Sequence, residues 1–362
     1  MAIFAYFAVV ILMLSTCSNG DNGNNELEAH SDVLLLNFTS DFDTGELRWM
    51  DIESTNLFNS ALPFGQDSKI STADGHIFIL SRYPGVLTCI LPERIGDESA
   101  IKQKRLNAEN PYEAVVIGNE GYIALRDEDY IQVFDPSTCA LTGKIDLPVK
   151  SANAASIKAS GDTLLVLLQR LIWEGASMST TTPPGLLVRI NASTGTFIDS
   201  IRLNLYNPSA GILSGEKLYI SQTGLYDANM NIIINGAGIE VVDLTTGTAK
   251  VLVTGPKLGG GASSIALDKE NDILYVVAYE SFGQAPVKPV NLANITVGAA
   301  LPDIINSFGG IIFDKETKKL FAADRPLKNP GLKIYSPATN QTIAVNQGSH
   351  ALPPYSLAIY RF

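Results

Sequence analysis

Few stretches of this sequence combine side chains that could do chemistry, and the most suggestive is TSDFDTGEL at residues 39–47. Asp41 and Asp43 stand at alternate positions and Gly45 follows, which is how many calcium loops begin. A complete calcium loop also needs further oxygen ligands and a bidentate glutamate at the proper distance. Glu46 comes too early for that role, and the chain then enters a strand-like segment. We interpret the stretch as a turn that joins two strands.

The histidines and glycines do not indicate a cofactor site. The sequence contains only three histidines, His30, His76 and His350, too few for a His-rich copper or haem centre, and no Cys/His spacing is typical of zinc. The glycines at 259–261 neither lead from a strand into a helix nor precede a Lys-Ser/Thr pair, as a phosphate loop requires. No Ser/His/Asp set can be identified. We therefore assign no catalytic residue and expect no metal and no cofactor.

Two of the three cysteines, Cys89 and Cys139, lie within the globular part of the chain. Such a pair could form a disulfide in an oxidising compartment. Cys89 falls inside an apolar strand-like segment, however, whereas Cys139 takes the glycine position of a turn. Because their positions in the repeat described below differ, the pattern favours two free thiols over a disulfide.

The composition indicates an all-β protein without a nucleic-acid partner. Hydrophobic residues make up 46% of the chain and charged residues only 17%, with 30 glycines and 18 prolines. This mix is typical of a β protein with many turns. The net charge of −11 provides nothing to neutralise a run of phosphates, so we exclude nucleic acid as a partner.

The N-terminus has the pattern of an export signal. Residues 2–14, AIFAYFAVVILML, are almost all apolar and a polar run follows them. About a dozen apolar residues are too few to span a bilayer but suit the core of a signal peptide. We therefore predict a signal peptide at residues 1–16.

The residues around Cys17 resemble a lipobox. Leu14-Ser-Thr-Cys17 is similar to the motif of bacterial lipoproteins, although Thr16 stands where Gly, Ala or Ser is usual and no Lys or Arg precedes the apolar core. The resemblance implies lipidation of Cys17 and a flexible, Asn- and Gly-rich tether at 17–31. Ser18 is not the aspartate that retains lipoproteins in the inner membrane, so it implies an outer-membrane lipoprotein. The alternative is an ordinary secretory signal with an incidental cysteine.

From residue 32 onwards the chain repeats. A strand-like segment ends in a polar residue and enters a turn in five copies: LRWMD at 47–51, IQVFD at 131–135, LVRIN at 187–191, IEVVD at 239–243 and LKIYS at 332–336. Degenerate copies at 87–91 and 287–292 bring the number of units to seven. The mean spacing of about 47 residues is a period typical of propellers and solenoids.

Each repeat contains four short strands. Most copies of the polar-ended segment continue into a Thr-containing turn, in which Asp, Asn or Ser stands first and Gly, Asn or Cys139 stands last, which is hairpin chemistry. An apolar first strand, a tight turn and a second strand precede it, as in EAVVI, GNEG and YIAL at 113–125. A fourth strand follows the Thr-containing turn. Four-stranded units repeated radially make a seven-bladed β-propeller.

The two ends of the repeat region indicate how the ring closes. Residues 32–37, DVLLLN, already have the pattern of a second strand, so the first unit lacks its inner strand. The last residues, PPYSLAIY at 353–360, have the pattern of an inner strand. We expect one shared blade with its inner strand from the C-terminus, and a single propeller domain over 32–362.

These units resemble the YVTN family of bacterial seven-bladed propellers. The resemblance rests on the Asn-Pro steps at 110–111 and 207–208, on second strands such as ILYVV and on third strands such as VVDLTTG, although no blade carries the YVTN tetrapeptide itself. It covers residues 32–362. It implies a non-catalytic surface or periplasmic propeller.

One face of the predicted propeller carries the long, irregular loops. These join the second to the third strand of a blade, or one blade to the next, and the longest are at 171–184 and 222–231. Irregular loops on a rigid scaffold are where binding usually occurs. We call this the long-loop face, and the opposite end the short-turn face. The candidate contacts on the long-loop face are Trp173, Tyr226, Tyr279, Phe282, Asp324 and Arg325.

The function expected from these patterns is non-catalytic binding. We expect an envelope-anchored binding or scaffold propeller that engages a protein or small-molecule ligand through its long-loop face. One alternative is that the loops merely pack over the channel mouth. Another is a metal-assisted lactonase or hydrolase at the central channel, because acidic loop residues are available for calcium (Asp127, Glu128, Asp129, Glu280, Asp324), although their spacing is not diagnostic.

Overall fold

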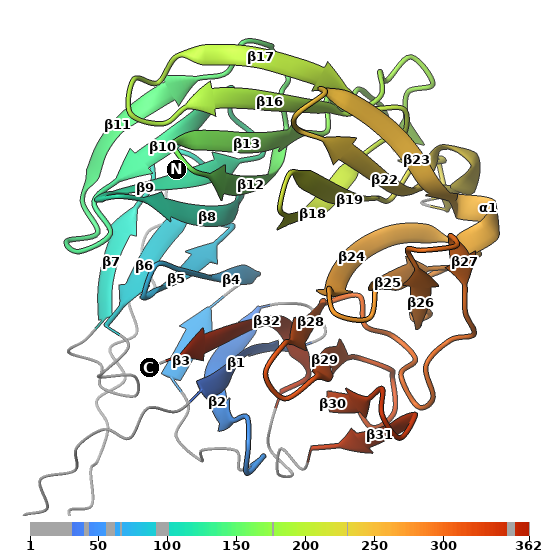
Figure 1. Cartoon of the computed structure of the whole chain (residues 1–362). Coiled ribbons are helices and arrows are strands. Elements are labelled where there is room, and N and C mark those ends of the chain that lie inside the picture. The colour runs from blue at the N-terminus through green and yellow to red at the C-terminus, as the bar shows by residue number, and fades with distance from the viewer. Residues whose placement is uncertain are drawn as a thin grey trace, which may run out of the picture.

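The computed structural model describes residues 31–39, 43–55, 62–65, 67–91, 101–175, 177–229, 231–345 and 352–361. These residues form seven four-stranded antiparallel sheets arranged as the blades of a β-propeller (Figure 1). The predicted all-β, seven-bladed architecture is confirmed. The predicted signal peptide, Cys17 and the tether up to residue 30 lie outside the described residues. No helix in the described part of the chain is both long and apolar enough to cross a bilayer.

The ring closes in blade 1, where the two ends of the chain share one sheet. From the inside outwards its strands are β32 (Pro354–Arg361), β1 (Ser31–Phe38), β2 (Thr44–Asp51) and β3 (Leu62–Gly65). Leu34 of β1 stands opposite Ala358 of β32 on one side and Trp49 of β2 on the other. The C-terminal strand therefore supplies the inner strand of the first blade, as predicted.

The remaining blades follow the chain, each from its inner to its outer strand. Blade 2 has β4 (Ser68–Ala73), β5 (His76–Ser81), β6 (Val86–Ile90) and β7 (Ile101–Arg105); blade 3 has β8 (Pro111–Ile117), β9 (Glu120–Leu125), β10 (Tyr130–Phe134) and β11 (Leu141–Asp146); blade 4 has β12 (Ala154–Ser160), β13 (Thr163–Leu168), β16 (Leu186–Asn191) and β17 (Phe197–Arg202). Blade 5 has β18 (Pro208–Ser214), β19 (Lys217–Gln222), β22 (Gly238–Asp243) and β23 (Thr248–Thr254); blade 6 has β24 (Gly261–Asp268), β25 (Ile273–Tyr279), β26 (Val287–Asn291) and β27 (Thr296–Val297); blade 7 has β28 (Ile311–Asp314), β29 (Lys319–Asp324), β30 (Gly331–Ser336) and β31 (Gln341–Ala344).

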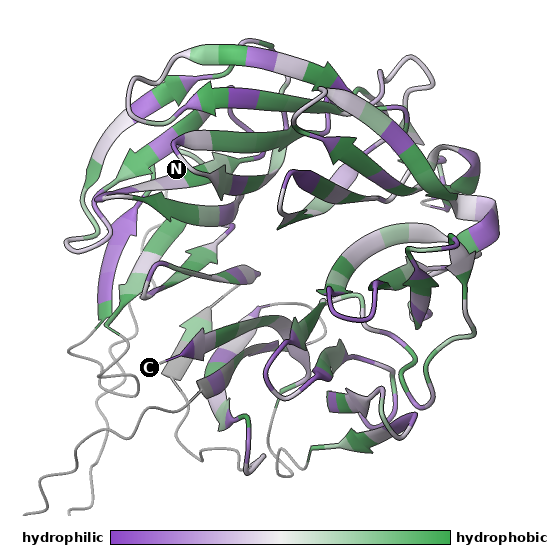
Figure 2. Cartoon of the chain, in the orientation of Figure 1, coloured by the Kyte–Doolittle hydropathy of each residue, from purple (hydrophilic) through white to green (hydrophobic). Residues whose placement is uncertain are grey.

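The hydrophobic core lies between neighbouring blades. Side chains alternate across each sheet, so every blade presents an apolar set to the blade on either side. Phe78 of blade 2 meets Phe134 of blade 3 edge to face, with the ring centroids 5.1 Å apart. In Figure 2 hydrophobic residues run along the strands, whereas the outer strand β7 is hydrophilic. This packing fixes the blades around the channel and makes the ring a rigid support for its loops.

The Asp-x-x-Thr turns have the geometry that their sequence predicts. The carboxylate of Asp135 accepts hydrogen bonds from the backbone N–H of Ser137 at 2.8 Å and from the side chains of Ser137 and Thr138 at 2.7 Å. These donors, chiefly the Ser137 hydroxyl, lower the pKa of Asp135 to about 2. Cys139 adopts the left-handed conformation with φ of 64°, close to the 66° of Gly195. The third-to-fourth strand turns therefore follow one design.

Cys89 and Cys139 form a disulfide, so the expectation of two free thiols is wrong. Cys89 lies on β6 of blade 2, and Cys139 lies in the β10–β11 turn of blade 3. The repeat aligns residues that occupy the same position in different blades. A disulfide between adjacent blades instead joins residues at different positions of the repeat, so their mismatch in the alignment does not argue against a bond. The turn of blade 3 packs over the strand of blade 2 and brings the two Cα atoms to 6.0 Å.

The stretch at 39–47 belongs to a hairpin. Residues 40–42, which include Asp41, lie outside the described residues. On either side of them, the N–H of Thr39 donates to the carbonyl oxygen of Thr44 at 2.9 Å, and Phe38 pairs with Gly45. The loop joins the second to the third strand of blade 1 and therefore belongs to the long-loop face, as predicted.

Candidate functional site

The inner strands enclose a channel that widens into a cavity on each face. The cavity at the short-turn face has a volume of about 1190 Å³ and the one at the long-loop face about 560 Å³. Glu113 and Ala210 line both, so the two cavities meet near the middle of the channel. The two differ sharply in chemistry.

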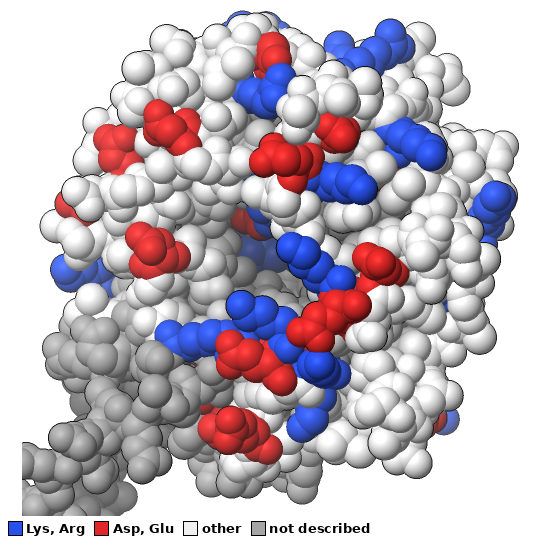
Figure 3. Space-filling view, viewed as in Figure 1, with Lys and Arg blue, Asp and Glu red and all other residues white. Residues whose placement is uncertain are grey.

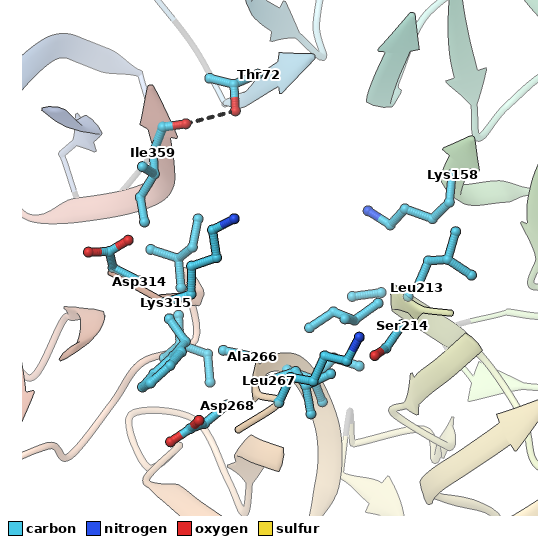
Figure 4. Close-up of a pocket in the computed structure, with 18 of the residues that line it drawn as sticks. Thr72, Lys158, Leu213, Ser214, Ala266, Leu267, Asp268, Asp314, Lys315 and Ile359 are labelled. Atoms are coloured by element: carbon cyan, nitrogen blue, oxygen red, sulfur yellow. Dashed lines mark hydrogen bonds between the residues drawn. The ribbon is translucent and has the colours of Figure 1, made fainter. Parts of the chain in front are cut away.

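At the short-turn face, charged side chains are largely paired with one another. Lys158 bonds to Glu113, Lys318 lies 2.7 Å from Glu270, and Arg361 pairs with Asp314. Figure 3 shows the hollow at the centre of the ring with basic and acidic side chains around it. Figure 4 shows Lys158 and Lys315 pointing into this wide opening from opposite sides. This end is an open vestibule with nearly balanced charge, and we assign no site to it.

At the long-loop face, cations gather around two tyrosines. The guanidinium carbons of Arg82 and Arg126 lie 4.7 and 5.7 Å from the ring centroid of Tyr112. The ammonium of Lys69 lies 4.1 Å from the ring centroid of Tyr355. All five side chains line the cavity. Aromatic faces attract such cations, so the rings help to hold like charges close together.

Only part of this positive charge is neutralised. Among the residues described as lining the cavity, the carboxylates are Asp67, which pairs with Arg82, and Glu113, which pairs with Lys158 at the channel waist. Within the described chain, neither Arg126 nor Lys69 has a carboxylate at ion-pair distance. Burial, together with the nearby guanidinium of Arg82, lowers the pKa of Lys69. A chain with a net charge of −11 thus contains a locally positive cavity.

The two arginines occupy equivalent positions in successive blades. Each is the first residue after the second strand, and its N–H donates to the carbonyl oxygen of the residue that precedes the inner strand. The pairs are Arg82 with Asp67, Arg126 with Asn110, Gln169 with Asn153 and Thr223 with Asn207. All four donor residues line the cavity. One position of the repeat therefore supplies its polar wall from blades 2 to 5.

A β-bulge turns a further side chain towards the channel in four inner strands. In β8, β12, β18 and β24 the pairing register shifts by one residue near the long-loop face. The extra residues are Tyr112, Ala155, Ser209 and Ser263, and all four line the cavity. Bulges commonly re-aim side chains beside binding sites. Here they account for the placement of Tyr112.

Aromatic side chains from the long loops form the outer wall of the cavity. Trp173, Tyr226 and Phe308 line it, and 46% of Trp173 and 43% of Phe308 are exposed. Trp173 lies on the short strand β14 (Trp173–Glu174), which pairs with β15 (Ser177–Met178). The loop of Tyr226 is likewise a small hairpin of β20 (Leu225–Tyr226) and β21 (Ile232–Ile233).

The two hairpins support one another through a small apolar cluster. Leu171 and Met178 from the first pack with Leu225 from the second, and Tyr206 and Tyr226 lie against them. Burial raises the pKa of the Tyr226 hydroxyl, which keeps this residue neutral. This apolar cluster therefore holds the aromatic wall of the cavity in place.

Only some of the six predicted contact residues line the cavity. Trp173 and Tyr226 line the cavity, and Tyr279 packs on Phe308 with ring centroids 5.5 Å apart. Phe282 is 92% exposed but does not line the cavity. Asp324 is only 1% exposed, and its carboxylate accepts the N–H groups of Ile305 and Asn306 at 3.0 and 2.6 Å.

Arg325, the last of the six, ties the closing blade together. Its guanidinium donates to the main-chain oxygens of Pro353 at 2.7 Å and of Phe38 and Thr39 at 3.2 Å. Arg325 follows the second strand of blade 7, and its own N–H donates to the carbonyl oxygen of Asn306. It is therefore the equivalent of Arg82 and Arg126, turned from the channel to the seam of the ring.

The metal-assisted alternative finds no site in the described part of the chain. No group of three or more His, Cys, Asp or Glu side chains there could hold a metal ion. His76 sits at the short-turn face, where its Nδ1 lies 2.8 Å from the carbonyl oxygen of Asp74. His30 and His350 lie outside the described residues.

Comparisons with known proteins identify the fold and no family. No protein-family model matches the sequence, and comparison with curated proteins gives no match. Among solved structures, hydrazine synthase from Kuenenia stuttgartiensis is 11% identical, with 86% of this chain and 94% of that chain covered and a TM-score of 0.59. Apo AztD from Citrobacter koseri is 12% identical over 92% and 98%, with a TM-score of 0.55.

A functionally unknown protein from Desulfotomaculum acetoxidans is similar to the same degree. It is 12% identical, with 91% of this chain and 98% of that chain covered and a TM-score of 0.60. Likeness at this level of identity shows a shared propeller fold. The function must therefore be argued from the site itself.

Proposed function

We propose that this chain is a non-catalytic binding or scaffold propeller that engages a ligand or protein partner at its long-loop face. The observation that carries the proposal is the meeting, in one cavity, of Arg126 without a carboxylate partner among the described residues and the exposed ring of Trp173. Binding sites are concave, lined by apolar and aromatic groups, and contain a few convergent polar groups. The cavity volume of about 560 Å³ suits a small molecule or a side chain of a partner.

The chemistry of the cavity supports binding rather than catalysis. Within the described lining there is no histidine, and each lining carboxylate is engaged by a cation. The arrangement favours holding an occupant over transforming it.

We propose further that the protein is exported and anchored by lipid at Cys17, as a YVTN-type propeller of the bacterial outer membrane or periplasm. The apolar segment at 2–14 and the lipobox-like residues up to Cys17 support the anchor. The Cys89–Cys139 disulfide supports an oxidising compartment, since disulfides persist there and are rare in the cytosol. A mass measurement on the membrane-extracted N-terminal peptide tests this; an unmodified Cys17 would contradict it.

Binding itself is tested by retention from envelope extracts. Immobilised wild-type protein is exposed to the small-molecule and protein fractions of an envelope extract, and what it retains is identified by mass spectrometry. Trp173→Ala removes the exposed ring of the cavity, and Phe197→Ala removes a ring that is 50% exposed on the outer strand β17. We expect retention to fall with Trp173→Ala alone. Equal retention by both variants would contradict a site at the long-loop face.

A further inference from the structure

The cavity at the long-loop face has features that specify the class of its occupant. We propose that it binds a small ring-bearing organic anion, with the carboxylate or phosphate group of that ligand at Arg126 and its ring against Trp173. This inference rests on the proposed binding function and narrows it. Three observations carry it: spare donors, unpartnered buried polar atoms and exposed aromatic faces.

The spare donors belong to Arg126. A guanidinium has five N–H donors in a planar fork that matches a carboxylate or a phosphate. Nε of Arg126 donates to Oε1 of Gln169 at 3.1 Å, and Nη1 makes a long contact of 3.4 Å with the hydroxyl of Tyr112. The described residues provide no further acceptor, so at least three N–H groups are available to an anion.

The surrounding charge makes an anion the preferred occupant. Lys69 and Arg82 share the cavity with Arg126. Asp67 forms an ion pair with Arg82 and also attracts the ammonium of Lys69, which leaves Arg126 without a carboxylate partner among the described residues. In such a partly desolvated site an added cation would be repelled, and a neutral group would leave the excess charge in place. An anion would relieve it.

Three buried polar atoms of residues that line the cavity have no hydrogen-bond partner. They are Oδ1 of Asn207 and Oδ1 of Asp67, which are acceptors, and Oγ of Ser263. Asn207 is 5% exposed, and its Nδ2 already donates to the carbonyl oxygen of Gly224 at 3.0 Å. Buried polar groups are normally satisfied, so these atoms indicate a ligand with a hydroxyl or amine donor in addition to its acid group.

The remaining surface of the cavity favours a ring. Trp173 and Phe308 line it and remain about half exposed, and the apolar cluster of the two loop hairpins holds Tyr226 in place. Offset or edge-to-face packing on such rings adds to the free energy gained from area alone. The three observations therefore converge: the spare donors of Arg126 in a locally positive cavity, the unpartnered buried polar atoms and the aromatic wall.

The test is calorimetric titration with compounds matched in shape and different in charge. The probes are 4-hydroxybenzoate and 4-hydroxyphenyl phosphate as anions, 4-hydroxybenzamide as the neutral compound and 4-hydroxybenzylamine as the cation. We expect at least one anion to bind more tightly than the neutral and cationic compounds. Comparison of the two anions distinguishes a carboxylate site from a phosphate site.

Variants locate the anion. Arg126→Met keeps the aliphatic stem and is expected to weaken anion binding by about 10- to 100-fold, the effect of losing charge-assisted hydrogen bonds. Arg126→Lys is expected to recover part of the loss, because it restores charge without the fork. Arg105→Met, on the exposed outer strand β7, is the control and should leave affinity unchanged. Circular dichroism checks that each variant is folded.

Several results would overturn the inference. Binding of 4-hydroxybenzamide or 4-hydroxybenzylamine as tightly as the anions would do so, and so would an Arg126→Met protein that binds anions like the wild type. If none of the four compounds binds, the proposal of a ring-bearing anion is also overturned. In each of these cases retention from envelope extracts, with its dependence on Trp173, still decides the broader binding function separately.

Discussion

The guanidinium of Arg82 lies over the ring of Tyr112, 4.7 Å from its centroid, although the two residues belong to different blades. Arg126 approaches the same ring from blade 3, at 5.7 Å. The ring thus stabilises two guanidinium groups that would otherwise repel one another. The channel wall and the stability of the blade 2–blade 3 interface are linked through this one side chain.

Removing this ring should destabilise the protein. Tyr112→Ala is expected to lower the free energy of unfolding by about 1–2 kcal/mol, because it removes two cation–π contacts and leaves the two arginines facing each other. Tyr112→Phe keeps the ring and should stay within about 0.5 kcal/mol of the wild type. Urea unfolding measures both. A phenylalanine variant as unstable as the alanine variant would assign the effect to the hydroxyl instead.

Arg325 should matter for closure of the ring. Arg325→Met removes charge-assisted hydrogen bonds to carbonyl oxygens of both the N-terminal and the C-terminal segment of the closing blade, and we expect a loss of about 2–4 kcal/mol in unfolding free energy. The matched control is Arg202→Met on the exposed edge of β17. Both are measured by urea unfolding. If the two variants are equally stable, the seam does not depend on Arg325.

The disulfide should contribute to stability across two blades. Cys89 and Cys139 are separated by 50 residues, and the loop-entropy relation gives about 4 kcal/mol for a closed loop of this size. We expect dithiothreitol to lower the melting temperature of the wild type to that of Cys89→Ser/Cys139→Ser. The double variant itself should not respond to the reductant. If dithiothreitol changes the melting temperatures of the two proteins by the same amount, the disulfide contributes nothing to stability.

Lys69 should give stability a distinct pH dependence. Loss of solvent, with Arg82 and Arg325 nearby and Asp67 acting in the opposite direction, holds the pKa of Lys69 below its usual 10.5. The folded protein therefore releases this proton at a lower pH than the unfolded chain does, and stability rises with pH between the two pKa values. Relative to Lys69→Met, the wild type should gain stability as the pH approaches 10.5. Unfolding titrations at pH 7 and pH 10 measure the difference; a constant difference would refute this.

The repeat made most of the fold predictable from sequence. The polar-ended third strands, their Asp-x-x-Thr turns and the inner-strand pattern at 353–360 led to seven blades and to the shared blade that closes the ring. These features are local, since the carboxylate of a turn residue such as Asp135 accepts a hydrogen bond from a backbone N–H of the same turn. Local chemistry repeated at a regular period is a strong signal.

The contacts between blades were not predictable in the same way. Cys89 and Cys139 occupy unlike repeat positions and meet because adjacent blades stack. Arg82 and Arg126 could have been found by aligning the residue that follows each second strand, but the loops after it differ in length and obscure the alignment. From the sequence we expected Asp324 and Arg325 to be exposed loop residues. In the structure Asp324 is buried and Arg325 donates to main-chain oxygens, so both have structural roles.

The location of binding can be measured directly by hydrogen–deuterium exchange, with and without the small-molecule fraction of an envelope extract. Residues 169–175, 177–185, 223–229 and 231–237 form the two loop hairpins of the long-loop face, and 268–272 and 314–318 are turns of the short-turn face. A ligand at the long-loop face predicts slower exchange in the hairpins and unchanged exchange in the turns. Protection confined to the turns, or no protection in either set, would contradict the assignment of binding to the long-loop face.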